Sequence, residues 1–308
     1  MRLSLARMPK GNRGIDRFLS LLITKLKEQG VEIVDTDKRS DIHLAVISGS
    51  KKKGSRNVVR IDGVYYDTAR LGNNKTIKNT IQSFEGVVYQ SAWSKKFATG
   101  MLGVSNPKSA VIWNGTDPSI YRKADPYKHD FDKAFVCCAH WRPNKRLAAT
   151  IEAFRRTRKQ LDRNLGLFIV GEPDCKVPND PAIKAFGSVK KRSELASIYR
   201  ASNYLVHICH LDACPNSVVE ALVCGLPVLS NNIGGTPELV GSDGIILPLD
   251  QPFNFKPVSS IDRVVPIDLD ILADGMKSMV ARDWVVDRPD LDISRSAQQY
   301  MRFFGELL

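Results

Sequence analysis

The sequence has no long apolar run. None of its apolar stretches approaches the roughly 18 residues that a membrane-spanning helix needs, and residues 1–11 lack the apolar core of a signal peptide. We therefore expect a cytoplasmic protein. The 308 residues are nevertheless 43% hydrophobic. That is enough for one large domain or two domains of ordinary size, and two is the better expectation.

The sequence also lacks the cysteine spacing of a metal site. It contains no C-x-x-C pair, and its five histidines show no zinc-ligand pattern. The six cysteines all lie after residue 136, four of them within or beside apolar stretches: Cys137, Cys138, Cys175, Cys209, Cys214 and Cys224. This distribution favours buried free thiols in a reducing compartment over a disulfide framework.

Acidic residues are in the minority. The chain has 45 Lys and Arg against 33 Asp and Glu, a formal charge of +12, which implies an anionic partner. Nucleic acid, an acidic membrane surface and a phosphorylated small molecule all fit the net charge alone. The basic residues are scattered, with short runs at residues 51–53 and 190–192, and no basic motif interleaved with aromatic residues occurs. We expect no nucleic-acid partner, and peripheral membrane contact stays open.

Apolar periodicity predicts alternating strands and helices in the first part of the chain. A strand over residues 3–8 precedes a helix whose apolar stripe runs from Ile15 to Leu26 and stops near Gly30. Further strands are expected over residues 31–34, 42–48, 57–61, 86–90 and 110–113, with helices over residues 73–84 and from residue 94 onward.

A polar segment separates this part from a second alternating part. Residues 117–132 contain two prolines and no apolar period, and alternation restarts at residue 134 and continues to residue 230. The pattern predicts an α/β fold of two successive units with parallel sheets. A last helix, over residues 294–308, carries one apolar face that must pack on something: Tyr300, Phe303, Phe304 and Leu307.

The stretch CPNSVVEALVCG, residues 214–225, places a carboxylate, Glu220, inside an apolar run. Pro215 suits the first helical position, and Gly225 suits the position just past the helix end. The first N–H groups of such a helix form an anion site: those of Asn216, Ser217 and Val218. At the carboxyl edge of a parallel sheet the anion is expected to be a phosphate, and Glu220 would accept hydrogen bonds from a ribose. The alternative is an amphipathic helix whose Glu220 reaches water.

The loop HWRPNKR, residues 140–146, lies between an expected strand and an expected helix. It holds three cations: Arg142, Lys145 and Arg146. Two or three cations in such a loop can neutralise a diphosphate, Arg through forked hydrogen bonds and Lys as a point charge. The alternative is that these side chains are solvated.

Taken together, these motifs resemble the GT-B glycosyltransferases of the large retaining family 4. The E-x7-E signature of that family corresponds to Asp212 and Glu220, with Asp in place of the first Glu. Further matches follow in the family's order: WNGTD at 113–117, WRPNKRL at 141–147, FGSV at 186–189 and GLPVLSNNIGGTPELV at 225–240. The resemblance covers residues 86–240 well and the rest loosely.

The resemblance implies a GT-B fold, in which two Rossmann-like domains face each other across a cleft. We expect an acceptor-binding domain over residues 1–116, a linker over 117–132 and a nucleotide-sugar-binding domain over 133–293. The helix over 294–308 would pack back on the first domain.

The resemblance also implies roles for individual residues. Arg142 and Lys145 would bind the donor diphosphate, and Val189 would meet the nucleobase through its backbone. Glu220 would hold the ribose, and Asp212 would contact sugar hydroxyls as a catalytic residue. Asp212 is one methylene shorter than the usual Glu, so its role is less firmly implied.

Other positions depart from the family pattern. Arg142 and Lys145 are three residues apart where the family often has a longer gap. Arg146 replaces the usual Gly, and Cys214-Pro215 replaces the usual aromatic-Gly pair.

The first part of the chain offers weaker candidates. PKGNRG at 9–14 follows a strand and opens a helix, and Gly11 and Gly14 would let the backbone approach the donor, although an ordinary turn explains them as well. Asp62 ends an apolar strand, where the family often has a polar active-site residue, so we predict a catalytic role for it. A turn-forming Asp-Gly is the equally good alternative.

We therefore predict a retaining glycosyltransferase that moves a sugar from a UDP- or GDP-sugar donor to a hydroxyl of a glycan or other acceptor, without metal or cofactor. D-x-D patterns such as those at 35–37, 268–270 and 290–292 are expected by chance among 33 acidic residues. The alternatives are another GT-B enzyme, such as an epimerase or a phosphorylase-like protein, and an inactive module that binds sugar or nucleic acid.

Overall fold

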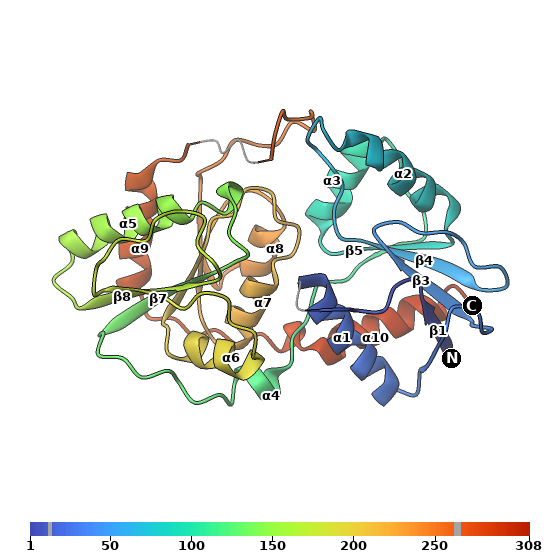
Figure 1. The fold of residues 1–308 in the computed structure, drawn as a ribbon, viewed down its shortest axis with the longest axis horizontal. Helices are drawn as coiled ribbons and strands as arrows, with labels where there is room; N and C mark the ends of the chain where they lie inside the picture. The colour runs from blue at the N-terminus through green and yellow to red at the C-terminus, as the bar shows by residue number, and fades with distance from the viewer. Residues whose placement is uncertain (12–13, 262–265) are drawn as a thin grey trace. The chain divides into compact units, whose positions relative to one another are not determined.

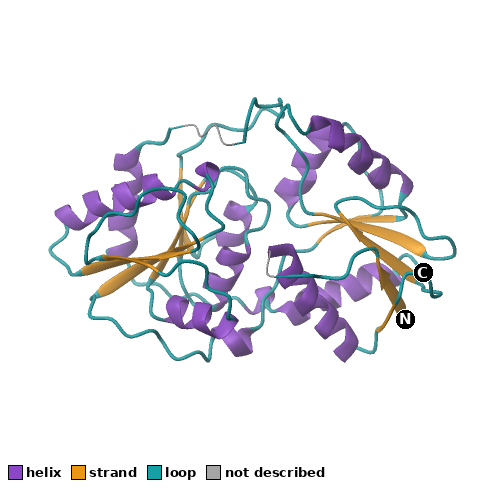
Figure 2. Cartoon of the chain, in the orientation of Figure 1, coloured by secondary structure: helices purple, strands orange, loops and turns teal. Residues whose placement is uncertain are grey.

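The computed structural model describes residues 1–11, 14–261 and 266–308. The chain forms two compact units, each with its own six-stranded parallel sheet. Helices cover both faces of each sheet (Figure 2). The two units are made of these segments: residues 1–116, 253–261 and 290–308 in unit 1, and residues 117–252 and 262–289 in unit 2. The α/β prediction is confirmed.

The sheet of unit 1 has the strand order β2-β1-β3-β4-β5-β6 (Figure 1). Its four central strands are mostly buried, because helices cover both faces of the parallel sheet, and the two edge strands are more exposed. Alternate side chains along β4 enter the two cores, Val58 on one face and Val59 on the other. The strand bounds are Arg2–Leu5 (β1), Glu32–Val34 (β2), Ile42–Val46 (β3), Arg56–Ile61 (β4), Gly86–Tyr89 (β5) and Ser109–Val111 (β6).

Four α-helices cover this sheet. Helices α1 (Gly14–Glu28) and α10 (Ile293–Gly305) share the core on one face, and α2 (Asn74–Ser83) and α3 (Ala92–Leu102) share the core on the other. The apolar face expected of the last helix is buried in the first of these cores. A Cβ at Gly86 would lie 2.7 Å from Leu307 Cδ1, so a larger residue there would require the side chains of α10 and the C-terminus to shift. Short 3-10 helices span Leu71–Asn73 (η1) and Pro289–Leu291 (η3).

The sheet of unit 2 has the strand order β12-β11-β10-β7-β8-β9. Its strands are Lys133–Cys138 (β7), Leu165–Val170 (β8), Ile183–Ala185 (β9), Tyr204–His207 (β10), Val228–Asn231 (β11) and Gly244–Leu247 (β12). Its helices are Pro118–Tyr121 (α4), Pro143–Lys145 (η2, a 3-10 turn), Leu147–Gln160 (α5), Arg192–Arg200 (α6), Asn216–Val223 (α7), Thr236–Val240 (α8) and Leu269–Val280 (α9). The reversal of strand order between β10 and β7 opens the carboxyl edge of the sheet, where ligands bind in such folds.

Three segments differ from the predicted domain boundaries: residues 117–132, 253–261 and 290–293, the last of which groups with unit 1 rather than unit 2. The expected linker, residues 117–132, groups with unit 2 and contains helix α4, which begins at Pro118 because the side chain of Asp117 caps the N–H of Ser119 at 2.9 Å. Residues 253–261, expected in the second domain, group with unit 1. There, Val258 exchanges backbone hydrogen bonds with residues 66 and 68.

None of the helices in the described part of the chain is long and apolar enough to span a membrane. All six cysteines are free thiols, as expected.

Candidate functional site

The loops after β7, β10 and β11 meet at the carboxyl edge of the sheet of unit 2. The loop after β10 carries His210 and Asp212, and the loop after β7 carries Lys145 and Arg146. The third loop closes tightly on the second, because the N–H of Gly235 donates to the Asp212 carbonyl at 2.7 Å. A Cβ at Gly234 would lie 2.5 Å from that carbonyl oxygen, so glycine is required there.

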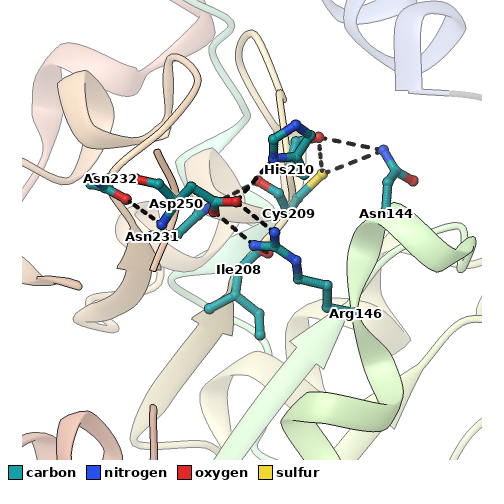
Figure 3. Close-up of polar contacts among 8 residues, drawn as sticks. All are labelled: Asn144, Arg146, Ile208, Cys209, His210, Asn231, Asn232 and Asp250. Carbon is teal, nitrogen blue, oxygen red and sulfur yellow. Dashed lines mark hydrogen bonds and ion pairs between the residues drawn. The ribbon is translucent and has the colours of Figure 1, made fainter. Parts of the chain in front are cut away.

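Arg146 is the structural anchor of the loop after β7 (Figure 3). Its backbone lies in the left-handed region, with φ 60° and ψ 40°, where glycine is usual. Its buried guanidinium donates two hydrogen bonds to Asp250, at 2.7 and 2.5 Å, and one to the Ile208 carbonyl at 3.3 Å. Its interpretation as a diphosphate ligand is therefore wrong, because its charge is already matched inside the protein.

Asp250 connects three parts of this edge. It also accepts hydrogen bonds from His210 Nδ1 at 3.0 Å and from Asn231 Nδ2 at 2.5 Å (Figure 3). Burial alone would raise the pKa of Asp250, but the hydrogen bonds from Arg146, His210 and Asn231 hold it far below its usual range. The carboxylate stays ionised and fixes the loops after β7, β10 and β11 to one another.

The predicted donor residue Lys145 contacts the predicted catalytic residue Asp212. Lys145 Nζ lies 2.6 Å from Asp212 Oδ2, and the two side chains are only 14% and 21% exposed. Burial would lower the pKa of Lys145, but the charge of Asp212 raises it well above its usual value. Burial would raise the pKa of Asp212, but Lys145 lowers it, with help from His207 and the Cys214 N–H. Both groups are charged at neutral pH.

Two buried residues beside this pair were not predicted as site residues. His207 Nε2 lies 3.8 Å from Asp212 Oδ2, and burial together with the charge of Lys145 lowers the pKa of His207 to about 4, against the opposing charge of Asp212. Burial raises the pKa of Cys209 to about 11. The signal in the sequence was the spacing H-x-C-x-x-D directly after a strand, which is not one of the common zinc patterns.

Arg142 is exposed and lies at the start of the 3-10 turn that also contains Lys145. The turn therefore presents one exposed cation and one buried, paired cation. The diphosphate-binding roles of both residues stay predictions.

Helix α7 begins one residue later than predicted. Pro215 has an extended backbone, with φ −68° and ψ 122°, and is the N-cap rather than the first helical residue. Its carbonyl accepts the N–H of Val218 at 3.0 Å and that of Val219 at 3.2 Å. The prediction that the Val218 N–H is free for an anion is therefore wrong. Asn216 and Ser217 remain at the first turn, where the positive end of the helix dipole lies.

Glu220 is buried, with 7% exposure, so the solvent-facing alternative is wrong. Its Oε2 accepts a hydrogen bond from the Tyr199 hydroxyl of helix α6 at 3.4 Å. A buried carboxylate in an apolar helix face needs polar partners. A contact to a ribose stays a prediction.

Val189 lies in the loop that follows β9 and is 8% exposed. This loop is held by Glu172, whose Oε1 accepts the Ser188 N–H at 2.9 Å, and by Gly187, whose φ of +62° suits glycine. The nucleobase contact stays a prediction.

Unit 1 has a polar cluster at the carboxyl edge of its own sheet. Asp62, directly after β4, accepts hydrogen bonds at 2.5 Å from Arg60 Nε and from Gln90 Nε2. The guanidinium of Arg60 is 1% exposed and also donates to Tyr300 at 3.1 Å and to Asn114 at 2.7 Å. Burial raises the pKa of Asp62, although Arg60 and Gln90 oppose the rise. Among the described residues, none donates a hydrogen bond to Asp62 Oδ2.

The glycines predicted near the donor lie at the start of unit 1. Gly11 has a φ of +122°, which suits glycine, and Gly14 is the first residue of α1. Asn12 and Arg13 of the same PKGNRG segment lie outside the described residues. Asp16 is buried nearby and pairs with Arg7 at 2.5 Å.

The D-x-D patterns have local roles. Asp35 lies 3.7 Å from Lys38, and Asp270 lies 2.7 Å from Arg156. Asp268 and Asp292 cap helices α9 and α10.

Known proteins resemble this chain in sequence and in fold. Residues 132–256 match the family model described as Glycosyl transferases group 1. A curated relative is N-acetyl-alpha-D-glucosaminyl L-malate synthase of Bacillus anthracis, 22% identical over 188 residues. That stretch is 56% of this chain and 49% of the relative, so the match spans about half the length of the relative.

Solved structures extend the comparison to the whole chain. HepE of Anabaena, solved in complex with UDP-glucose, is 15% identical with a TM-score of 0.62 and covers 99% of each chain. Sucrose-phosphate synthase of Thermosynechococcus elongatus is 12% identical with a TM-score of 0.64 and covers 99% of this chain and 94% of that one. The predicted GT-B fold is confirmed, and residues 132–256 are similar to the glycosyl transferases group 1 family model.

Proposed function

We propose that the protein is a glycosyltransferase that moves a sugar from a nucleotide diphosphate-sugar to a hydroxyl acceptor. One observation carries this proposal. Within the stretch that matches the family, the charged pair of Lys145 and Asp212 lies beside the start of helix α7 at the carboxyl edge of a parallel sheet. This edge is where such sheets bind nucleotides.

The donor diphosphate would bind Arg142, Lys145 and the first turn of α7. Lys145 keeps its proton across the physiological range, so it offers a permanent positive charge. Asp212 holds that charge in place in the absence of donor and would turn to the sugar hydroxyls once the diphosphate takes the ammonium. Fixed cations and a helix terminus stabilise the negative charge that develops on the leaving diphosphate.

The donor is a UDP- or GDP-sugar in this proposal. The complex of HepE with UDP-glucose supports a nucleotide-sugar donor for a protein of this fold. Glu220 would bind the ribose and Val189 the base. The backbone at Gly11 and Gly14 would approach the donor from unit 1.

The acceptor would bind to unit 1, at the cluster around Asp62. This carboxylate has an oxygen with no hydrogen-bond donor among the residues that the structure describes. Asp62 can therefore take a hydroxyl hydrogen of the acceptor. We further propose a cytoplasmic enzyme, front-face attack by the acceptor hydroxyl with retention of configuration, and no metal in the transfer step.

Incubation of the protein with UDP- and GDP-sugars tests the activity. We expect one donor to raise the melting temperature and to release its nucleoside diphosphate slowly in water and faster with acceptor present. Binding without any turnover would favour the inactive sugar-binding module instead. A product whose anomeric carbon has the opposite configuration to that of the donor would contradict the retaining mechanism.

Treatment with a chelator distinguishes the metal-free mechanism from one that needs a divalent metal ion. We expect the rate to be unchanged after EDTA treatment, because fixed cations compensate the diphosphate charge. Loss of activity with rescue by Mn²⁺ would instead revive a metal-binding role for the D-x-D pattern at 35–37.

A further inference from the structure

Three side chains of the types that bind zinc surround the ammonium of Lys145. His207 ends strand β10, and Cys209 and Asp212 lie in the loop that follows it. One ligand atom from each lies within 4.8 Å of the others, and no other group of this kind occurs in the described ranges. Cys209 also contacts Asn144, which holds it against the loop after β7 (Figure 3).

His207 contributes a buried nitrogen atom to this cluster, close to the ammonium of Lys145. The side chain is only 6% exposed, so its Nε2 is shielded from water. This nitrogen has no hydrogen-bond partner within residues 1–11, 14–261 and 266–308. An unpaired buried nitrogen is unfavourable unless something binds it. Asp212 Oδ2 lies 3.8 Å away, slightly farther than the roughly 3.3 Å that separates a nitrogen and an oxygen ligand on one tetrahedral zinc ion.

We propose that His207, Cys209 and Asp212 form a binding site for a thiophilic divalent cation such as Zn²⁺, which competes with the ammonium of Lys145. Nitrogen, sulfur and carboxylate oxygen are the ligands that Zn²⁺ prefers, and water would complete a tetrahedron. Binding releases the thiol proton of Cys209 to solvent and leaves a thiolate on the metal. Lys145 keeps its proton and leaves Asp212.

The competition follows from charge. A divalent metal ion and an ammonium a few ångströms apart repel each other strongly in a partly buried site. Metal therefore binds best when the ammonium has moved away or is absent. If the proposed function holds, the same metal inhibits transfer, because it occupies Asp212 and displaces Lys145.

Cobalt titration of the reduced protein tests the site without any donor. Co²⁺ bound to a thiolate gives an intense near-ultraviolet charge-transfer band, and Zn²⁺ should abolish that band by displacement. We expect Cys209→Ser to remove the band and His207→Ala to weaken binding at least about tenfold. Cys175→Ser, at a half-buried thiol elsewhere in unit 2, is the matched control and should leave the band unchanged.

The sharpest variant is Lys145→Met, which keeps the length of the side chain and removes its charge. We expect it to bind Co²⁺ at least about tenfold more tightly than the wild type. Circular dichroism checks that each variant is folded. No band in the folded wild type, a band that survives Cys209→Ser, or weaker cobalt binding by Lys145→Met would each overturn the proposal. A wild-type protein that gives the expected cobalt results but binds no nucleotide would overturn the proposed function and support the metal site.

Discussion

The two units share one architecture but differ in charge. Unit 1 has 23 Lys and Arg against 12 Asp and Glu, a net charge of +11, whereas unit 2 has 22 against 21, a net charge of +1. The positive charge of the chain is therefore not a property of the unit that carries the proposed donor site. It predicts an anionic partner for unit 1, either an acidic acceptor or an acidic membrane surface.

The polar clusters at the two carboxyl edges differ in how many hydrogen bonds their buried carboxylates accept. In unit 2, the buried carboxylate of Asp250 is fully used by Arg146, His210 and Asn231. In unit 1, Asp62 is held by Arg60 and Gln90 and keeps one oxygen without a donor among the described residues. The difference separates a carboxylate whose hydrogen bonds hold loops together from one that has a buried oxygen without a donor.

The largest expected effect is on the stability of unit 2. Arg146→Ala leaves Asp250 buried without its main partner, and breaking a buried ion pair in this way lowers the free energy of unfolding by about 3–5 kcal/mol. Urea unfolding followed by circular dichroism measures the loss. Arg156→Ala, which removes an exposed partner of Asp270, is the matched control and should change stability little.

Arg146→Gly separates charge from backbone strain. Glycine suits the left-handed backbone at this position, so strain relief opposes the loss of the ion pair. We still expect destabilisation, because Asp250 stays unpaired. A glycine variant as stable as the wild type would show that the pair does not anchor the loop.

A smaller effect is expected from Asp62→Asn in unit 1. The amide keeps the shape of the side chain but cannot accept a proton, so we expect kcat with acceptor to fall about 100-fold while nucleoside diphosphate binding stays unchanged. Steady-state rates at saturating donor measure this. Equal losses of donor affinity and of rate would place Asp62 in the donor site. Asp62 would then no longer distinguish an acceptor site in unit 1 from the donor site in unit 2.

Glu220→Gln should have an effect of similar or smaller size, confined to the donor. A hydrogen bond to a charged group contributes about 1.5–3 kcal/mol, so donor binding should weaken by roughly one to two orders of magnitude. A nucleobase without ribose should bind both forms alike. Tyr199→Phe removes the hydroxyl that donates to Glu220 and controls for the packing of helices α6 and α7. Full donor affinity in Glu220→Gln would contradict the ribose contact.

The sequence predicted local features better than distant pairings. The apolar stripes of α1 and α10 and the buried strands follow from periodicity, which is set within a few residues. The pair of Arg146 and Asp250 joins residues 104 positions apart, and no local pattern reveals such a partner. As a result, a structural arginine was interpreted as a ligand.

The site was only partly predicted, because its contacts also join residues that are distant in the sequence. Lys145 and Asp212 were both singled out, but their contact depends on which loops the sheet order brings together. Periodicity left the direction of Glu220 open, because helix α7 is covered by apolar neighbours on nearly all sides and only tertiary packing buries the carboxylate. Residues 253–261 carry no regular period, so their place in unit 1 could not be predicted.

Calorimetric titration of UDP and GDP into the wild type, Arg142→Ala and Lys145→Ala tests the central claim most directly. The claim places the donor diphosphate at the carboxyl edge of unit 2, against the loop after β7. We predict that one of the two nucleotides binds the wild type, and that each variant stays folded and binds it about 10- to 100-fold more weakly, because each loses a charged hydrogen bond. Unchanged affinity in both variants would contradict the account and move the phosphate site elsewhere.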